Sequence, residues 1–153
     1  ISDTKGQAQT LLRSLDNQED NVPIMVHNVD TILLGRDWGP EEIWGADCVV
    51  DVFESSNRSY SYVIETDGLV EEIREKEVIS NKSSSGCYYF KSAGLIKKYI
   101  TEETNYISEA INNMIQDGLD VRATKMHKAS QTIVLGTPEE YLANLEDLRA
   151  FGR

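Results

Sequence analysis

The sequence predicts an α/β domain in which helices flank a mixed central sheet. The chain has 153 residues, which is the size of one domain with a core of its own. Short apolar runs bounded by turn residues, typical of strands, alternate with segments whose apolar residues recur at helical spacing. No internal repeat, low-complexity tract or linker interrupts this alternation, so we expect residues 1–153 to form a single domain.

The first expected elements are a short helix and a short strand. Three leucines and an alanine recur at helical spacing over residues 7–15. A polar run then leads to Pro23, and residues 24–27 form an apolar strand that ends at the Asn-Val-Asp stretch 28–30. Residues 40–42, Pro-Glu-Glu, favour a brief helical turn.

The middle of the chain predicts most of the sheet. Residues 48–53 are largely apolar and are therefore expected inside the sheet. Residues 60–65 and 69–73 are expected to be strands joined by an Asp-Gly pair, which is favoured in tight hairpin turns. The charged and polar segment that follows is interpreted as a loop, and Gly86 begins an aromatic strand over residues 86–90.

The C-terminal part predicts three helices and two strands. Residues 92–100 form a helix capped by its leading serine, and residues 106–116 form the clearest amphipathic helix, which an Asp-Gly pair ends. Residues 121–126 and 132–135 are expected to be strands. The last helix begins after Thr137, which is followed by proline and by a glutamate that can close a capping box.

Composition excludes several classes of partner. Fifteen basic against 26 acidic residues give a net charge of -11, which disfavours nucleic acid and anionic membranes. No apolar run approaches the roughly 18 residues of a membrane span, and the N-terminus lacks the pattern of a signal peptide. The two cysteines lie in apolar strand-like runs without Cys-x-x-Cys spacing. We therefore expect reduced core thiols in a cytoplasmic protein without structural zinc.

Asp30 is the first candidate for a functional residue. It lies just beyond the C-terminal end of the apolar strand 24–27, where open α/β sheets place groups that contact ligands. Mg²⁺ prefers a few carboxylate oxygens together with substrate phosphates, so a single aspartate can anchor it. An Asn-x-Asp turn that only ends the strand explains these residues equally well, and both interpretations stay open here.

Glu75 and Lys76 form the second candidate. A lysine at a strand end can neutralise a phosphate monoester, and the glutamate can accept sugar hydroxyls or orient the lysine. Charged pairs of this kind are also common on surfaces. The context favours a site, because a polar stretch ending in Ser-Ser-Ser-Gly follows and offers hydroxyls and backbone groups that suit a pyranose. Tyr88 and Tyr89 alternate across the next strand, so one of them should face the pocket.

Gly6 is the third candidate. A glycine at the start of a helix lets a planar base approach the backbone, although a simple helix-start residue fits as well. Trp38 and Trp44 lie in the region after Asp30 and are interpreted as packing residues, or as part of a contact surface in a homo-oligomer. The two histidines have no triad-like partners and receive no catalytic role.

Taken in order, these landmarks resemble the sugar-1-phosphate nucleotidyltransferase family, in particular glucose-1-phosphate thymidylyltransferase-like enzymes. Residues 5–8 resemble the segment that closes over the base, and residues 24–30 resemble the strand that delivers the metal-binding aspartate. The sugar-phosphate pocket corresponds to residues 75–76, 80–81 and 86–88. Residues 105–108 resemble the segment that leads into a late helix, and residues 135–140 match a terminal Gly-Thr-Pro-Glu signature.

The resemblance implies a Rossmann-like nucleotide-diphospho-sugar transferase fold and a Mg²⁺-dependent reaction. A sugar-1-phosphate would attack the α-phosphorus of a nucleoside triphosphate and expel pyrophosphate, giving a nucleotide sugar for surface polysaccharide or lipopolysaccharide synthesis. Asp30 would hold Mg²⁺ and Lys76 would fix the attacking phosphate. The implied substrate-binding residues are Gly6, Glu75, Ser84, Gly86 and Tyr88.

Two departures from the family pattern qualify this expectation. The family begins with a strand and a glycine-rich loop that cradles the triphosphate, and no such run precedes Gly6. The chain is therefore expected to be the C-terminal portion of a nucleotidyltransferase domain, with little or no turnover alone. Many members also carry a second metal-binding aspartate at the position occupied by Val134.

Two other functions stay open. GT-A-type glycosyltransferases use a similar sheet and an Asp-x-Asp metal motif, of which Asn28-Val29-Asp30 is a degenerate version. A non-catalytic nucleotide-sugar-binding or assembly domain fits Val134 and the missing loop. A phospho-alcohol such as phosphocholine is a further possible substrate.

Overall fold

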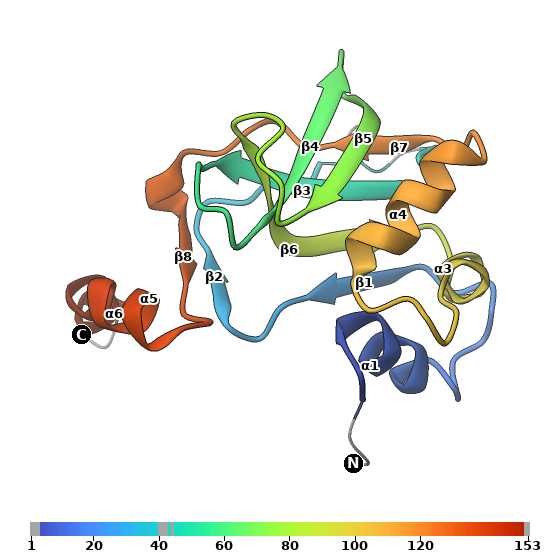
Figure 1. Cartoon of the computed structure of the whole chain (residues 1–153), viewed down its shortest axis with the longest axis horizontal. Coiled ribbons are helices and arrows are strands. Elements are labelled where there is room, and N and C mark those ends of the chain that lie inside the picture. The colour runs from blue at the N-terminus through green and yellow to red at the C-terminus, as the bar shows by residue number, and fades with distance from the viewer. Residues whose placement is uncertain (1–3, 40–42, 44, 152–153) are drawn as a thin grey trace.

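The computed structural model describes residues 4–39, 43 and 45–151 of the chain. The turn expected at residues 40–42 and the tryptophan at position 44 lie outside this part. Two sheets and several helices make up the structure (Figure 1).

The main sheet has six strands in the order β1-β6-β3-β7-β5-β4. Strands β3 and β7 run parallel, and the other neighbours are antiparallel, so the predicted mixed sheet is confirmed. One further pairing joins β4 to β6, which curls the sheet. The strands are β1 (Ile24–His27), β3 (Cys48–Glu54), β4 (Ser61–Thr66), β5 (Leu69–Glu75), β6 (Lys82–Phe90) and β7 (Val121–Ala123).

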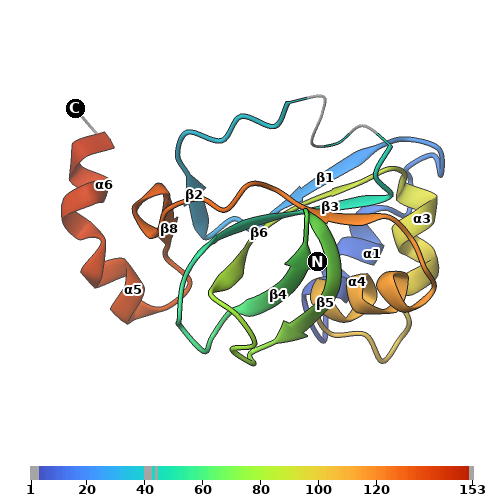
Figure 2. The same cartoon turned by 90° about the horizontal axis from the view of Figure 1, so that it is seen from above.

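Three helices cover one side of this sheet, α1 (Gln7–Ser14), α3 (Ala93–Tyr99) and α4 (Ile107–Gln116). They gather at one end of the molecule in both views (Figures 1 and 2). Their apolar faces meet the inner faces of β3 and β6 in one core, as the amphipathic patterns predicted. Fully buried members include Val50, Val52, Phe90, Ile96, Ile107, Ile111 and Met114.

A small second sheet and two helices lie at the other end of the molecule (Figure 1). Strand β2 (Thr31–Leu33) pairs antiparallel with β8 (Thr132–Val134), and α5 (Pro138–Ala143) and α6 (Leu145–Phe151) follow β8. The predicted caps are confirmed. The Ser92 hydroxyl accepts from the Leu95 amide at 3.1 Å, and the Thr137 hydroxyl accepts from the Glu140 amide at 3.1 Å.

A buried ion pair ties the second sheet to the main one. Asp51 lies on β3 at a register shift between Val50 and Val52, and its side chain is fully buried. Arg36, which follows β2, places its Nε 3.0 Å from Asp51 Oδ2. The same guanidinium donates to the carbonyl of Gln131, just before β8, at 3.0 Å. Because breaking such a buried pair costs several kcal/mol, roughly 3–5, the position of β2 is well fixed.

The structure differs from the sequence-based expectation in three places. The serines before Gly86 are not in a loop, because β6 begins at Lys82. Ser83 to Ser85 are buried and their hydroxyls are hydrogen-bonded, for example Ser83 Oγ to the Ser61 carbonyl at 3.2 Å. Strand β2 was not expected. Strand β7 ends at Ala123, after which the chain bends toward His127, which makes an isolated bridge to Phe53.

Both cysteines are buried and free, as predicted. Burial and the nearby Asp51 carboxylate raise the pKa of the Cys87 thiol to about 12. Within the part of the chain that the structure describes, the helices are all too short or too polar to traverse a bilayer.

Candidate functional site

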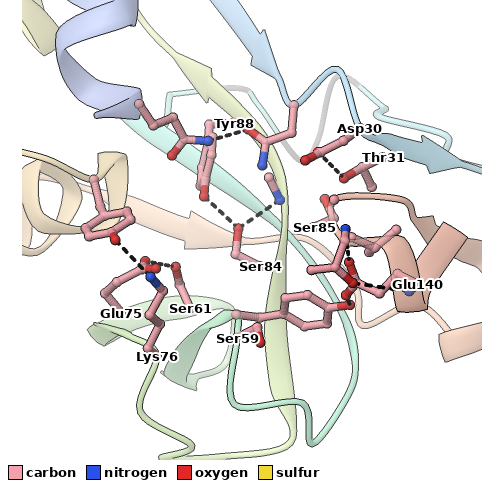
Figure 3. A pocket seen from close by; sticks show the side chains of 18 residues that line it. Asp30, Thr31, Ser59, Ser61, Glu75, Lys76, Ser84, Ser85, Tyr88 and Glu140 are labelled. Atoms are coloured by element: carbon pink, nitrogen blue, oxygen red, sulfur yellow. Dashed lines mark hydrogen bonds between the residues drawn. The ribbon is translucent and has the colours of Figure 1, made fainter. Parts of the chain in front are cut away.

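A cavity of about 300 Å³ lies where the ends of several elements meet. It is lined from the turn after β1, the adjoining ends of β4 and β5, the middle of β6, the start of α4 and the segment between β8 and α5. Six of the residues singled out from the sequence line it together: Asp30, Glu75, Lys76, Ser84, Gly86 and Tyr88. Figure 3 shows Asp30 and Lys76 on opposite sides of the pocket, with Ser84 between them.

Asp30 forms the end of the pocket next to the second sheet. Its backbone carbonyl accepts from the Leu135 amide at 2.7 Å, and its Oδ1 accepts from the Thr31 hydroxyl at 3.3 Å. Its Oδ2 lies 2.8 Å from the point that a Cβ on Gly136 would occupy, and Glu140 Oε2 lies 3.6 Å from that same point. A glycine at position 136 therefore leaves room for two carboxylates to face one space.

Lys76 forms the opposite end. The residue has a φ of 56°, in the left-handed region, and its amide donates to the Tyr60 carbonyl at 3.0 Å. Its Nζ donates to the Tyr106 hydroxyl at 2.8 Å and lies 4.8 Å from the centre of that ring. The hydrogen bond to Tyr106 favours the charged ammonium and raises the pKa of Lys76.

Glu75 acts as a junction between three elements. Its Oε2 accepts from the hydroxyl of Ser61 on β4, and from the hydroxyl of Ser108 on α4 at 2.8 Å. The sequence left open whether this carboxylate orients Lys76. In the structure the hydrogen-bond partner of Lys76 is Tyr106, and Glu75 holds the walls on either side of it.

The floor of the pocket comes from β6. Ser84 Oγ donates to the Tyr88 hydroxyl at 3.0 Å and accepts from the Gly86 amide at 3.2 Å. Burial raises the pKa of Tyr88, so its phenol stays a neutral hydrogen-bonding group. Gly86 has a φ of +79°, and a Cβ there would lie 2.2 Å from the Asn28 side-chain amide. Asn28 in turn accepts from the Gln7 side chain, which connects α1 to the pocket.

Tyr60 and Glu140 close the side of the pocket between β4 and α5. The Tyr60 hydroxyl donates to Glu140 Oε1 at 2.6 Å, and Glu140 Oε2 accepts from the Thr137 amide at 3.0 Å. Burial, together with this carboxylate, raises the pKa of Tyr60. One glutamate thus caps helix α5 and bonds to the pocket wall.

Gly6 is the one predicted substrate-binding residue outside the cavity lining, although its neighbour Gln7 is part of it. A Cβ on Gly6 would lie 2.5 Å from the Asn105 carbonyl oxygen, so close packing alone explains the glycine. Its expected contact with a nucleotide base stays a prediction.

Tyr60, Tyr106 and Glu140 are among the pocket residues that received no role in the site from the sequence. Glu140 was interpreted as a capping residue in the segment 135–140 and Tyr106 as the start of a helix in the segment 105–108, and both segments resemble the family. Their positions next to the pocket depend on contacts between elements far apart in the chain, which local patterns do not carry.

No protein-family model matches the chain, and no curated protein sequence matches it significantly. Solved structures do match. A nucleoside-diphosphate-sugar pyrophosphorylase from Vibrio cholerae has a TM-score of 0.76 and 24% identity, over 95% of this chain and 66% of that one. The fold is that of the sugar-phosphate nucleotidyltransferases. The fold-level resemblance expected from the sequence is thereby confirmed.

Two further nucleotidyltransferase structures agree. A UDP-glucose pyrophosphorylase in complex with UDP-glucose has a TM-score of 0.74 and 15% identity, over 97% of this chain and 64% of that one. The inositol-1-phosphate CTP transferase from T. maritima has a TM-score of 0.71 and 10% identity, over 95% and 61%. The chain thus spans 61% to 66% of the length of these three nucleotidyltransferases.

The nucleotidyltransferase fold raises the question of a metal. Among the described residues, no group of three or more His, Cys, Asp and Glu side chains forms a ready metal cage. Val134 lines the pocket without a side-chain oxygen. Mg²⁺ nevertheless needs only one or two protein carboxylates when substrate phosphates supply further oxygens. Asp30, with Glu140 beside it, fits that requirement.

Proposed function

We propose that the protein transfers a nucleotidyl group from a nucleoside triphosphate to a sugar-1-phosphate or a similar phosphorylated small molecule. The observation that carries the proposal is a pocket with the ammonium of Lys76 at one end and the carboxylate of Asp30 at the other, along a wall rich in hydroxyls. The nucleotidyltransferase fold supports it, and one of the similar structures is a complex with UDP-glucose.

In this proposal Lys76 binds the phosphate of the sugar substrate. Its ammonium has three N–H donors, and one of them is used by Tyr106. The remaining two can bind phosphate oxygens and neutralise part of their charge. Ser84 and Tyr88 offer hydroxyls to the sugar ring from the floor, and Glu75 keeps the adjoining walls together.

The reaction is an in-line displacement. An oxygen of the sugar phosphate forms a bond to the α-phosphorus, and the bond from that phosphorus to the bridging oxygen of pyrophosphate breaks. Positioning and charge neutralisation account for most of such catalysis, since no covalent enzyme intermediate is required. Asp30 would hold Mg²⁺, which when bound neutralises charge on the phosphates. The product, a nucleotide sugar, would supply the synthesis of surface polysaccharides.

An assay of pyrophosphate release tests this function. The chain and the full-length product of its gene are supplied with each nucleoside triphosphate, Mg²⁺ and a panel of hexose-1-phosphates and phosphocholine. We expect little or no turnover by the chain alone. From the full-length product we expect pyrophosphate and a nucleotide sugar or its analogue, and a loss of at least tenfold in kcat/KM on Lys76→Met. Lys91→Met is the matched control, because Lys91 pairs with Asp47 on the surface.

Other outcomes point to the alternative functions. Sugar transfer from a nucleotide sugar to an acceptor without pyrophosphate would indicate a glycosyltransferase and contradict the proposal. Tight binding of a nucleotide sugar without turnover by the full-length protein would indicate a binding domain.

A further inference from the structure

We infer that Tyr106 is a positioning residue that holds Lys76 ready for a phosphate group and so makes the pocket selective for phosphorylated ligands. The inference rests on the proposed function of the pocket. Tyr106 contributes no charge, and its hydroxyl is the side-chain partner of Lys76 Nζ, at 2.8 Å.

Tyr106 is itself firmly held. It stands immediately before α4, and its amide donates to Glu109 Oε2 at 3.2 Å. The next residue, Ile107, is fully buried in the core and anchors the start of the helix. A half-buried aromatic ring attached to such a helix has few positions open to it, so its hydroxyl is a fixed acceptor.

Lys76 needs such an acceptor. Its side chain is exposed and has a long flexible stem, which in isolation would sample many rotamers. The backbone end is fixed by the left-handed conformation and by the hydrogen bond to Tyr60, and Tyr106 fixes the other end. The ring also lies under the ammonium at 4.8 Å, within the range of a cation–π contact. The lysine is therefore ordered before any ligand arrives.

Ordering Lys76 in advance affects only ligands that use it. A phosphate monoester binds an ammonium that has already lost its rotamer freedom, whereas a free hexose gains nothing from it. Immobilising one such side chain is worth a factor of roughly 2 to 10 in affinity. Tyr106→Phe should weaken the binding of hexose-1-phosphates by this factor and leave the weak binding of the matching free hexoses unchanged.

Calorimetric titrations with glucose-1-phosphate, galactose-1-phosphate and the two free sugars test the inference. Tyr106→Phe keeps the ring and the fold, and Tyr99→Phe is the matched control, because its hydroxyl bonds to Asp117 away from the pocket. In a Lys76→Met background we expect Tyr106→Phe to have no further effect, since Tyr106 acts through the lysine. The inference would be overturned if Tyr106→Phe lowered affinity equally in the wild-type and Lys76→Met chains, or equally for free and phosphorylated sugars.

A second readout needs no ligand. The ammonium titration of Lys76, followed by NMR of its side-chain carbon, should move to lower pH in Tyr106→Phe and stay in place in Tyr99→Phe. An unchanged titration would overturn the contact on which the inference rests. If the titration moves as expected but the wild-type chain binds no hexose phosphate, the proposed function fails and the selectivity fails with it, while the Lys76–Tyr106 contact stands.

Discussion

Lys76 combines a side chain that we propose binds phosphate with an unfavourable backbone conformation. A residue other than glycine in the left-handed region costs about 1–3 kcal/mol, and such residues concentrate at functional sites. Lys76, at φ 56°, is one of two described residues of this kind, and the other, Asp67, lies in the tight turn between β4 and β5. The observed outlier thus supports a role for Lys76 beyond structure.

Replacing Lys76 should separate stability from binding. Lys76→Gly removes both the charge and the strain, whereas Lys76→Ala removes the charge but keeps a Cβ. We expect the glycine variant to be more stable than the alanine variant by about 1 kcal/mol, and both to lose affinity for hexose-1-phosphates. Chemical denaturation and calorimetry measure the two effects. An alanine variant at least as stable as the glycine variant would argue against backbone strain at this position.

Gly86 offers a test of the pocket floor. Gly86→Ala puts a Cβ on top of the Asn28 side chain and on a backbone with φ +79°. Gly118 has the same φ and open space around it, so Gly118→Ala carries only the backbone cost. The backbone cost should lower the free energy of unfolding of both variants by about 1–2 kcal/mol. The clash with Asn28 should lower that of Gly86→Ala further. Only Gly86→Ala should weaken phosphosugar binding, and a normal affinity would show that the Asn28 contact is unimportant.

At the scale of elements, the N-terminus of α5 links helix capping to the pocket. Thr137→Ala removes the cap and should cost about 1 kcal/mol of folding free energy. It also loosens Glu140, because the lost hydroxyl accepts from the Glu140 backbone amide. Glu140 Oε1 accepts from the Tyr60 hydroxyl in the pocket wall, so affinity for the phosphosugar should fall as well. Ser92→Ala removes the corresponding cap of α3 and is the control. It should cost similar stability in thermal melts and leave binding unchanged. Equal binding losses in both variants would contradict the link through Glu140.

The sequence predicted those elements whose signals are local. The capped helices, the Asp-Gly hairpin and the apolar strands all depend on residues a few positions apart. The three serines of β6 were misinterpreted as a loop, because polar side chains in a row usually indicate exposure to solvent. In the structure their hydroxyls are hydrogen-bonded, and a partner such as the carbonyl of Ser61 on β4 is not revealed by the neighbouring residues. Strand β2 was missed for a similar reason, since its partner β8 lies in the last part of the chain.

The residues of the candidate site also fall into those with a local sequence signal and those without one. Asp30 and Lys76 could be proposed because a charged residue at a strand end carries a local signal, and the structure brings both to one pocket. Tyr60, Tyr106 and Glu140 complete its walls through contacts with distant elements. No pattern within the segments that contain them indicates those contacts.

At the scale of the whole molecule, buried acids should make the fold sensitive to alkali. Burial raises the pKa of the Cys48 and Cys87 thiols and of the Tyr88 phenol. For Cys87 the pKa rises from 9.0 to about 12, so between these values the unfolded chain releases a proton that the folded chain keeps. The free energy of unfolding should therefore fall as the pH rises from 9 toward 12. Denaturant titrations should show a shallower fall for Cys87→Ala. An equally steep fall would contradict the assignment to this thiol.

The central claim is that Asp30 and Lys76 belong to one pocket for a phosphorylated sugar. A crystal structure of the chain with a hexose-1-phosphate tests it most directly. We predict the phosphate in contact with Lys76 Nζ and the sugar ring over Ser84 and Tyr88. A ligand bound elsewhere on the surface, with this pocket filled only by solvent, would contradict the account.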